Sequence, residues 1–133
     1  MSKAITYNLQ GMILSNILAP IDMMEMQVQE GEILLMDVTG DSTTEYVLDE
    51  VVVSRPIQNT VLDKLTLNAD GVDSIIISEA PNGFFSATNS VKRTGVSGEI
   101  IGSDTFSTTI VGTYKIRIES FPYLDFEATI EAI

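Results

Sequence analysis

Three aspartates near the middle of the chain come closest, by type and spacing, to a metal site. Asp70 and Asp73 flank the glycine of Ala69-Asp70-Gly71-Val72-Asp73, and Asp63 precedes them. Carboxylate oxygens suit Ca²⁺, but a calcium loop of the helix-loop-helix kind needs a longer series of oxygen ligands that ends in a glutamate. A hairpin turn with solvated carboxylates accounts for the same residues and is the commoner structure. We therefore predict no metal and no other cofactor.

Residues for nucleophilic or acid–base catalysis are scarce. The chain of 133 residues contains neither cysteine nor histidine, which removes the usual general base, the usual zinc ligand and the thiol nucleophile. Ser86, Ser97 and Ser103 therefore have no histidine to activate them, and no Gly-x-Ser-x-Gly motif is present. Asp125 and Glu127 fall on the outward side of a predicted strand, where a glycosidase pair would lack a pocket. We predict that the chain is not an enzyme.

The charge balance narrows the class of partner. Seven basic residues stand against 19 acidic residues, which gives a net charge of −12. This charge argues against binding to nucleic-acid phosphates or to an anionic membrane and favours neutral or basic protein surfaces, although solubility alone also explains it. The first ten residues are too polar for a secretory signal, and no apolar run approaches the ~20 residues that span a bilayer. We expect synthesis in the cytoplasm.

The last 22 residues predict the clearest elements. Apolar and polar residues alternate over 112–119 and again over 124–133, as in two half-buried strands joined by a corner that contains Pro122. The second strand is expected to pair with the first. Tyr114 follows Gly112 at the start of the first strand, so it is either a tyrosine corner, in which the phenol bonds upstream backbone, or an ordinary core residue.

The middle of the chain repeats short strand patterns. Between residue 57 and residue 111 we expect strands near 65–69, 75–77, 84–88, 99–101 and 105–110, with a loop over 89–98. Together with the last two strands, this gives about seven strands in fewer than 80 residues. Such spacing predicts one β-sandwich over residues 57–133.

Residues 1–56 form a less regular β-rich module. Strands are expected near 4–8, 11–14, 23–28 and 32–38, followed by a hairpin of 46–48 and 51–53 around Asp49-Glu50. No long segment shows a period of 3.6, so we expect almost no helix. The fold class is therefore all-β, with an N-terminal β-rich module of residues 1–56 followed by a β-sandwich.

Apolar residues of the first module suggest a docking interface. Thioethers adapt to irregular partners, although methionines more often simply fill a core. We assign the interface to the following residues: Met23, Met24, Met26, Ile33 and Leu35.

Other residues suggest surface recognition by the second module. The candidates are Phe84, Phe85, Lys92, Arg93 and Tyr123. The aromatic residues would contact a host surface, and the adjacent pair Lys92-Arg93 would meet an acidic partner or a glycan. A solvated loop pair is the simpler interpretation of Lys92-Arg93.

Two motifs resemble a known family. The stretch from Lys64 through Ala69-Asp70-Gly71-Val72-Asp73, followed later by Gly112-Thr113-Tyr114 and an alternating strand, resembles the bacterial immunoglobulin-like domains of the invasin and intimin type. The resemblance covers about residues 57–133. The chain departs from the family over 79–104, where the second half of the sandwich is shortened. The resemblance implies a trimmed immunoglobulin-like β-sandwich.

The overall layout also resembles small virion structural proteins of tailed bacteriophages. It combines a short β-rich leader, a hairpin, the Asp-Gly turn and the corner Phe121-Pro122-Tyr123. This resemblance implies a component of a tail or tail fibre that is made in the host cytoplasm, resides in the virion in several copies, contacts other virion proteins and displays its immunoglobulin-like domain. The alternatives are a capsid decoration protein and a module that adheres to host-surface glycans.

Overall fold

The computed structural model describes residues 1–92 and 94–133 and has an all-β fold. Strands make up 48% of the chain and helical turns 5%, which confirms the predicted fold class. The chain divides into two compact units, Met1–Pro56 and Ile57–Ile133.

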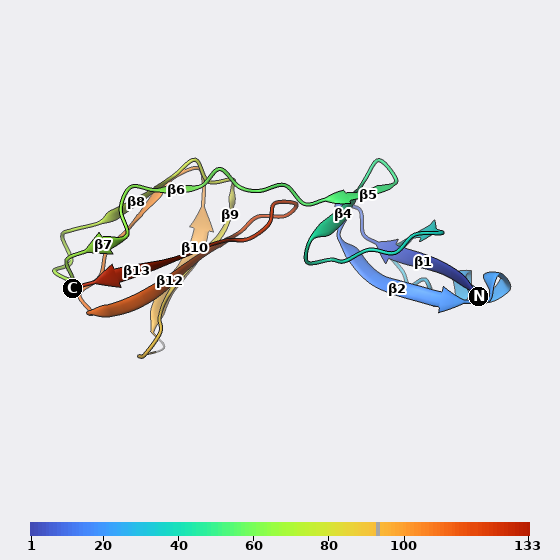
Figure 1. The fold of residues 1–133 in the computed structure, drawn as a ribbon, viewed down its shortest axis with the longest axis horizontal. Helices are drawn as coiled ribbons and strands as arrows, with labels where there is room; N and C mark the ends of the chain where they lie inside the picture. The colour runs from blue at the N-terminus through green and yellow to red at the C-terminus, as the bar shows by residue number, and fades with distance from the viewer. Residues whose placement is uncertain (93) are drawn as a thin grey trace. The chain divides into compact units, whose positions relative to one another are not determined.

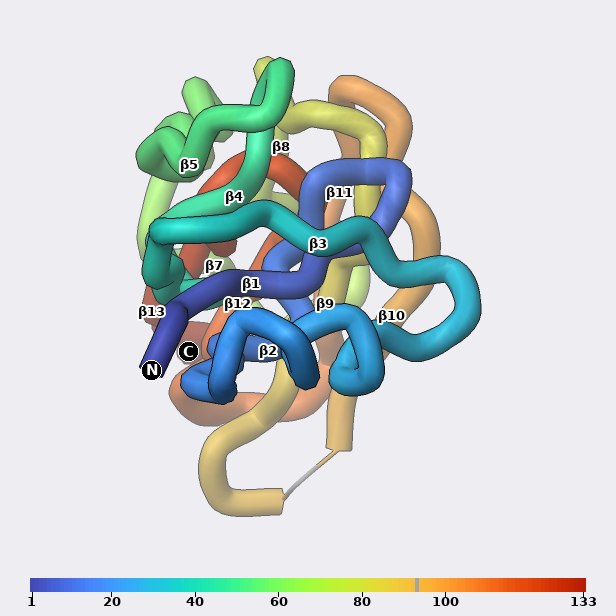
Figure 2. Tube along the Cα trace, turned by 90° about the vertical axis from the view of Figure 1, so that its right-hand side faces the viewer, coloured from blue at the N-terminus to red at the C-terminus, as the bar shows by residue number. Residues whose placement is uncertain are grey.

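The N-terminal unit is built on a three-stranded antiparallel sheet of order β2-β1-β3. Its strands are β1 (Ser2–Tyr7), β2 (Ile13–Ala19) and β3 (Ile33–Met36). Figure 2 shows β1 lying between the other two. Residues 4–7 of β1 are buried on both sides of the sheet, because each face is covered by another segment of the unit.

Two short 3₁₀ turns contribute to one face of this sheet. They are η1 (Ile21–Met23) and η2 (Glu25–Gln27), so the strand predicted over 23–28 is wrong. Met24 lies between the turns, and its side chain packs against Ala4 and Ala19. The small alanines leave room on the sheet that one methionine fills, and this long-range packing outweighs the local strand pattern.

A hairpin packs on the other face. It consists of β4 (Glu45–Leu48) and β5 (Val51–Ser54), as predicted, and Val47 joins Ile5 in this second small core. The two turn residues between the strands, Asp49 and Glu50, both have positive φ, at 51° and 64°. This conformation is the one that a two-residue hairpin turn of type I′ requires, although Asn-Gly is its usual sequence.

The C-terminal unit is a sandwich of two sheets (Figure 1). A five-stranded sheet has the order β10-β9-β12-β13-β7, and a three-stranded sheet has the order β11-β8-β6. The strands are β6 (Val61–Leu62), β7 (Thr66–Leu67), β8 (Ile75–Ser78), β9 (Gly83–Asn89), β10 (Gly95–Ile100), β11 (Asp104–Phe106), β12 (Gly112–Glu119) and β13 (Phe126–Ala132).

The connectivity of this unit is that of an immunoglobulin-like sandwich. The chain crosses between the sheets after β6, β7, β8, β10 and β11, so neighbours in sequence repeatedly lie in opposite sheets. β8 pairs with β11, β9 pairs with β12, and the short β7 runs parallel to the final strand β13. The three-stranded sheet ends at β11 without a fourth strand beyond it among the described residues, which agrees with a trimmed sandwich.

The closing strands match their prediction, whereas the middle differs from it. β12 and β13 pair directly from Gly112 and Ala132 to Ile118 and Phe126, and their inward side chains enter the core. The expected loop over 89–98 is wrong from Gly95 onward, because β10 pairs with β9 along its whole length. The strand expected over 105–110 ends at Phe106.

The core of the sandwich contains a tyrosine corner. Tyr114 is buried, and its hydroxyl donates to the carbonyl oxygen of Ile110 at 2.8 Å. The Tyr114 hydroxyl oxygen also lies 2.8 Å from the Thr108 hydroxyl, whose own oxygen accepts the Ile110 N–H at 3.1 Å. The ring of Phe106 meets Tyr114 edge to face at 5.2 Å. The tyrosine-corner alternative is therefore the correct one for Tyr114.

Candidate functional site

The predicted docking residues of the N-terminal unit fall into two groups. Met23, Met26 and Ile33 are exposed, and Met26 exposes 76% of its surface. Met24 exposes only 1% and belongs to the core, so its assignment to an accessible interface is corrected. Leu35 is half-buried against the core that contains Ile5 and contributes little free surface.

The exposed methionines belong to a longer apolar segment that we call segment 18–26. Leu18 is the second-last residue of β2 and Ile21 lies in η1, and the two residues are 69% and 71% exposed. With Met23 and Met26, four large apolar side chains therefore face solvent within nine residues. Met24 fixes this segment to the sheet, since it is the one methionine of the segment with a buried side chain. Leu18 and Ile21 were missed because they lie between the strands predicted near 11–14 and 23–28, where no local pattern indicates exposure.

The unit as a whole has an unusual distribution of apolar residues. Seven hydrophobic residues are buried and eleven large ones are exposed. The buried residues are Ala4, Ile5, Tyr7, Ile13, Ala19, Met24 and Val47. The exposed residues are Met1, Leu9, Met12, Leu14, Leu18, Ile21, Met23, Met26, Ile33, Leu48 and Val51. Four of the exposed residues belong to segment 18–26, and exposed apolar residues that gather in one place mark contact sites in soluble proteins.

The predicted recognition residues of the C-terminal unit do not form one site. Phe84 is the second residue of β9 and is 48% exposed, whereas Phe85 points inward, is 7% exposed and belongs to the core, which corrects its assignment. Lys92 is exposed beyond the other end of β9, and Arg93 lies outside the described residues. Tyr123 is half-buried in the β12–β13 corner, at the same end of the sheet as Phe84.

The three central aspartates accept hydrogen bonds from backbone amides. Asp63 accepts the amide of Ile76 at 2.7 Å, and Asp70 accepts two amides of its own turn at 2.8 Å. Asp73 pairs with the Lys64 ammonium at 2.6 Å and accepts the Asn68 amide at 2.8 Å. The hydrogen bonds of Asp70 and Asp73 thus stabilise the Asp-Gly turn. Among the described residues, no group of three carboxylate, histidine or cysteine side chains is arranged to hold a metal ion.

These hydrogen bonds shift the acidity of two of the aspartates. The Lys64 ammonium and the Asn68 amide lower the pKa of Asp73, because both stabilise its charged form. The backbone amides of Asp73 and Val72 lower the pKa of Asp70 in the same way. Both carboxylates are therefore ionised at neutral pH and act as structural acceptors.

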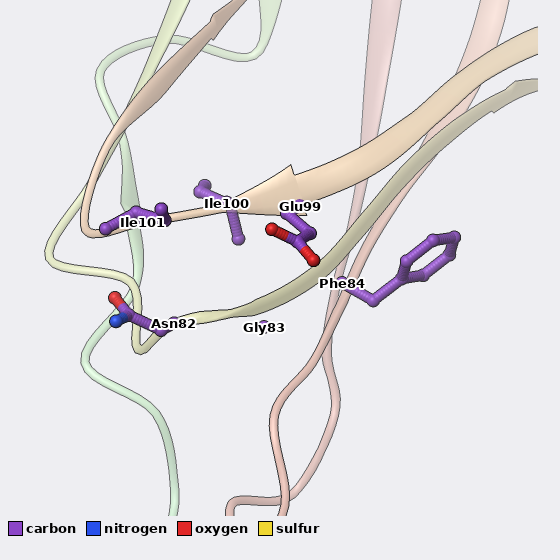
Figure 3. A pocket seen from close by; sticks show the side chains of 6 residues that line it. All are labelled: Asn82, Gly83, Phe84, Glu99, Ile100 and Ile101. Atoms are coloured by element: carbon purple, nitrogen blue, oxygen red, sulfur yellow. The ribbon is translucent and has the colours of Figure 1, made fainter.

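A hollow of about 430 Å³ adjoins Phe84 at one end of β9 and β10. Figure 3 shows Phe84 and Glu99 projecting from the two neighbouring strands, with Asn82 and Ile101 at the far end of the hollow. β9 also lies close to β12 at this end, and their close approach requires a glycine at position 83. A side chain at Gly83 would meet the backbone carbonyl oxygen of Glu119 at 2.2 Å.

A network of charges occupies the same outward sheet face. The Arg117 guanidinium lies 2.6 Å from Asp125, 3.3 Å from Glu119 and 3.8 Å from Glu127. The hydrogen bond that Arg117 donates to Asp125 is the main reason that the pKa of Arg117 is raised, with charge attraction from the carboxylates adding to it. One guanidinium is thus shared among three carboxylates, so the face keeps an excess of negative charge.

Comparisons of the chain with protein-family models, with curated proteins and with solved structures gave no match. The immunoglobulin-like character of residues 57–133 therefore rests on strand order and on the tyrosine corner. The helical segments in the described part of the chain are turns of three residues, and none has the length or the apolar character to cross a bilayer.

Proposed function

We propose that this chain is a non-enzymatic structural protein of a phage virion, a component of the tail or tail fibre. In this proposal the N-terminal unit docks into a larger assembly, and the immunoglobulin-like sandwich is displayed. The observation that carries the docking is the distribution of apolar side chains in residues 1–56, where eleven large ones are exposed and seven hydrophobic residues are buried. A unit of this size with so small a core gains stability from a partner that covers its surface.

Segment 18–26 supplies the contact in this proposal. Complete burial of a leucine, isoleucine or methionine side chain stabilises by about 1.5–3 kcal/mol, and the four side chains concerned are roughly half to three-quarters exposed. Covering Leu18, Ile21, Met23 and Met26 would therefore contribute about 4–8 kcal/mol before the costs of association. That range is large enough to hold a subunit in a multivalent particle.

The resemblance of the layout to small phage virion proteins supports the virion setting. The absence of cysteine and histidine from the sequence supports a non-catalytic role. The negative charge of −12 favours neutral or basic protein partners over nucleic acid.

Particle incorporation tests the proposal. Tagged wild-type chain and the double variant Ile21→Gln/Met26→Gln are expressed during particle production, and the chain is quantified in gradient-purified particles by mass spectrometry. Val72→Gln is the matched control, because Val72 is 85% exposed in the C-terminal unit. We expect wild type and control to be incorporated equally and the double variant to be depleted at least tenfold.

Two outcomes contradict separate parts of the proposal. Particles that contain no copy of the wild-type chain would exclude the virion role. Equal incorporation of the double variant would exclude docking through segment 18–26, even where the virion role holds.

A further inference from the structure

One aromatic side chain interrupts the polar outward face of the five-stranded sheet. The register of β9, β10, β12 and β13 places serine, threonine, glycine, lysine, arginine and glutamate on this face, and Phe84 is the one large apolar residue in those rows. Phe84 is directly opposite Glu99 in β10 and directly opposite Glu119 in β12. Side chains directly opposite each other on neighbouring strands have Cβ atoms about 4.5–5.5 Å apart, so Glu99 and Glu119 flank Phe84 on its two sides.

The carboxylates of this face outnumber its cations. The cations are Lys115 and Arg117, and the carboxylates are Glu99, Glu119, Asp125, Glu127 and Glu131. Arg117 and Lys115 are already engaged with acidic neighbours at 2.6 Å and 3.2 Å. Glu99 has no ion-pair partner among the residues that the structure describes. The row Glu99, Phe84, Glu119 therefore presents an aromatic ring between two carboxylates. Glu119 shares the Arg117 guanidinium at 3.3 Å, whereas Glu99 has no cation beside it in the described part of the chain.

We propose that this row, which we call the Phe84 site, binds an arginine side chain of a basic protein partner. The face of an aromatic ring carries negative partial charge and attracts a cation within about 6 Å of its centroid. A guanidinium can stack on the ring and donate hydrogen bonds to a carboxylate at the same time, because it is planar and carries five donors. Lysine offers a point charge without the stacking plane, so arginine fits this arrangement better.

The neighbouring hollow accommodates a residue next to that arginine. It has a volume of about 430 Å³ and is lined by Asn82, Gly83, Phe84, Glu99, Ile100 and Ile101. Ile101 is 72% exposed and gives the hollow an apolar wall (Figure 3). An apolar side chain beside the arginine would cover Ile101. The preferred ligand is therefore an arginine followed by an apolar residue in an accessible segment of the partner.

Charge complementarity selects a basic protein segment as the occupant. The net charge of −12 raises the local concentration of cationic partners and repels acidic proteins and nucleic acid. A neutral glycan would leave the charge of Glu99 without a counterpart. The inference concerns the C-terminal unit, so it stands or fails separately from docking through segment 18–26.

Titration of the full-length, ¹⁵N-labelled chain with the peptide acetyl-Gly-Arg-Leu-Gly-amide tests the proposal. We expect saturable amide shifts around residues 83–85, 99–101 and 118–120, with a Kd in the millimolar range. The same peptide with citrulline keeps the shape of arginine without its charge, and it should bind at least fivefold more weakly.

Matched variants separate the Phe84 site from diffuse charge. Phe84→Leu and Glu99→Gln should each weaken binding of the arginine peptide by about 2- to 5-fold, the range for an exposed cation–π contact or surface ion pair. Glu131→Gln makes the same charge change elsewhere on the face and should leave the Kd within 1.5-fold. Phe84 and Glu99 are exposed, so unchanged dispersion of the other resonances will show that the variants are folded.

Four results would overturn the proposal. The first is no saturable shift up to 20 mM peptide, and the second is equal binding of the citrulline peptide. The third is an equal effect of Glu131→Gln and Glu99→Gln, which would indicate diffuse attraction. The fourth is a response of the same amides to maltohexaose but not to the arginine peptide, which would assign the face to glycans.

Discussion

The hydrogen-bond ring of the tyrosine corner allows one stability prediction to be worked in detail. A phenol hydroxyl has one hydrogen, and Tyr114 donates it to the Ile110 carbonyl oxygen. The Thr108 hydroxyl must therefore donate to the Tyr114 hydroxyl oxygen. The Ile110 N–H in turn donates to the Thr108 oxygen. The two side chains therefore satisfy both backbone groups of Ile110, which lies between β11 and β12.

Tyr114→Phe removes two of these three hydrogen bonds and retains the ring. The edge-to-face contact with Phe106 at 5.2 Å should persist, because it involves no hydroxyl. Each lost hydrogen bond costs about 0.5–1.5 kcal/mol, which gives about 1–3 kcal/mol for the pair. Since Thr108 and Ile110 are half-buried and water can reach them, we expect about 1.5 kcal/mol.

Urea unfolding followed by the amide resonances of β12 measures this change for the C-terminal unit alone. Thr108→Val removes the threonine hydroxyl from the same ring of hydrogen bonds. The double variant Tyr114→Phe/Thr108→Val completes a double-mutant cycle. We expect the two effects to be non-additive by about 0.5–1.5 kcal/mol, because either substitution alone already opens the ring. A Tyr114→Phe effect below about 0.3 kcal/mol, or strict additivity, would refute the ring as a stabilising unit.

Two further predictions concern the same unit. Hydrogen bonding to Lys64 lowers the folded-state pKa of Asp73, so the stability that this provides is present above the unfolded pKa near 4 and is lost as the pH falls through the lower folded value. Asp73→Asn should therefore flatten the decline in unfolding free energy below about pH 4, and an unchanged slope would contradict this account. Gly83→Ala should destabilise the unit by about 2 kcal/mol or more, because its Cβ would meet the Glu119 carbonyl oxygen at 2.2 Å, whereas Gly98→Ala has no atom within 4 Å and should change thermal stability little.

Local patterns predicted the elements whose partners are adjacent in sequence. The alternation in residues 112–133 predicts β12 and β13 because one buried face leaves a single register for the pair. The hairpin around Asp49 and Glu50 was predictable for the same reason, although its turn residues adopt positive φ without a glycine. In both cases the information lies within about 20 residues.

Elements that depend on distant partners were mispredicted. The pattern of Met23, Met24 and Met26 predicts a strand. In the structure Met24 packs instead against Ala4 in β1 and Ala19 in β2, and the local pattern contains no sign of these contacts. β10 begins at a glycine, and Gly95 is needed there because a side chain would meet the Ala87 carbonyl oxygen at 2.1 Å. Judged from its neighbours in sequence alone, Gly95 indicates a loop. Its pairing with β9 makes it part of a sheet.

The candidate sites show the same limit. The sequence drew attention to Phe84 as an aromatic residue, but Glu99 and Glu119 are 15 and 35 positions further along the chain. Only the register of β9 with its two neighbours brings these carboxylates beside the ring. The inward position of Phe85 follows from the same register, since consecutive strand residues point to opposite faces.

The parallel pairing of β7 with β13 determines how the C-terminal unit would bear mechanical load. The backbone hydrogen bonds that join these segments include three: Glu131 N–H to Leu65, Ala69 N–H to Ile133 and Ile133 N–H to Leu67. Tension applied between residue 57 and residue 133 pulls the two parallel strands in opposite directions along their length. The three bonds are then strained together in shear, whereas the antiparallel hairpin of β12 and β13 is shielded until they break. A displayed sandwich attached at its two ends would therefore resist extension first at this short clamp.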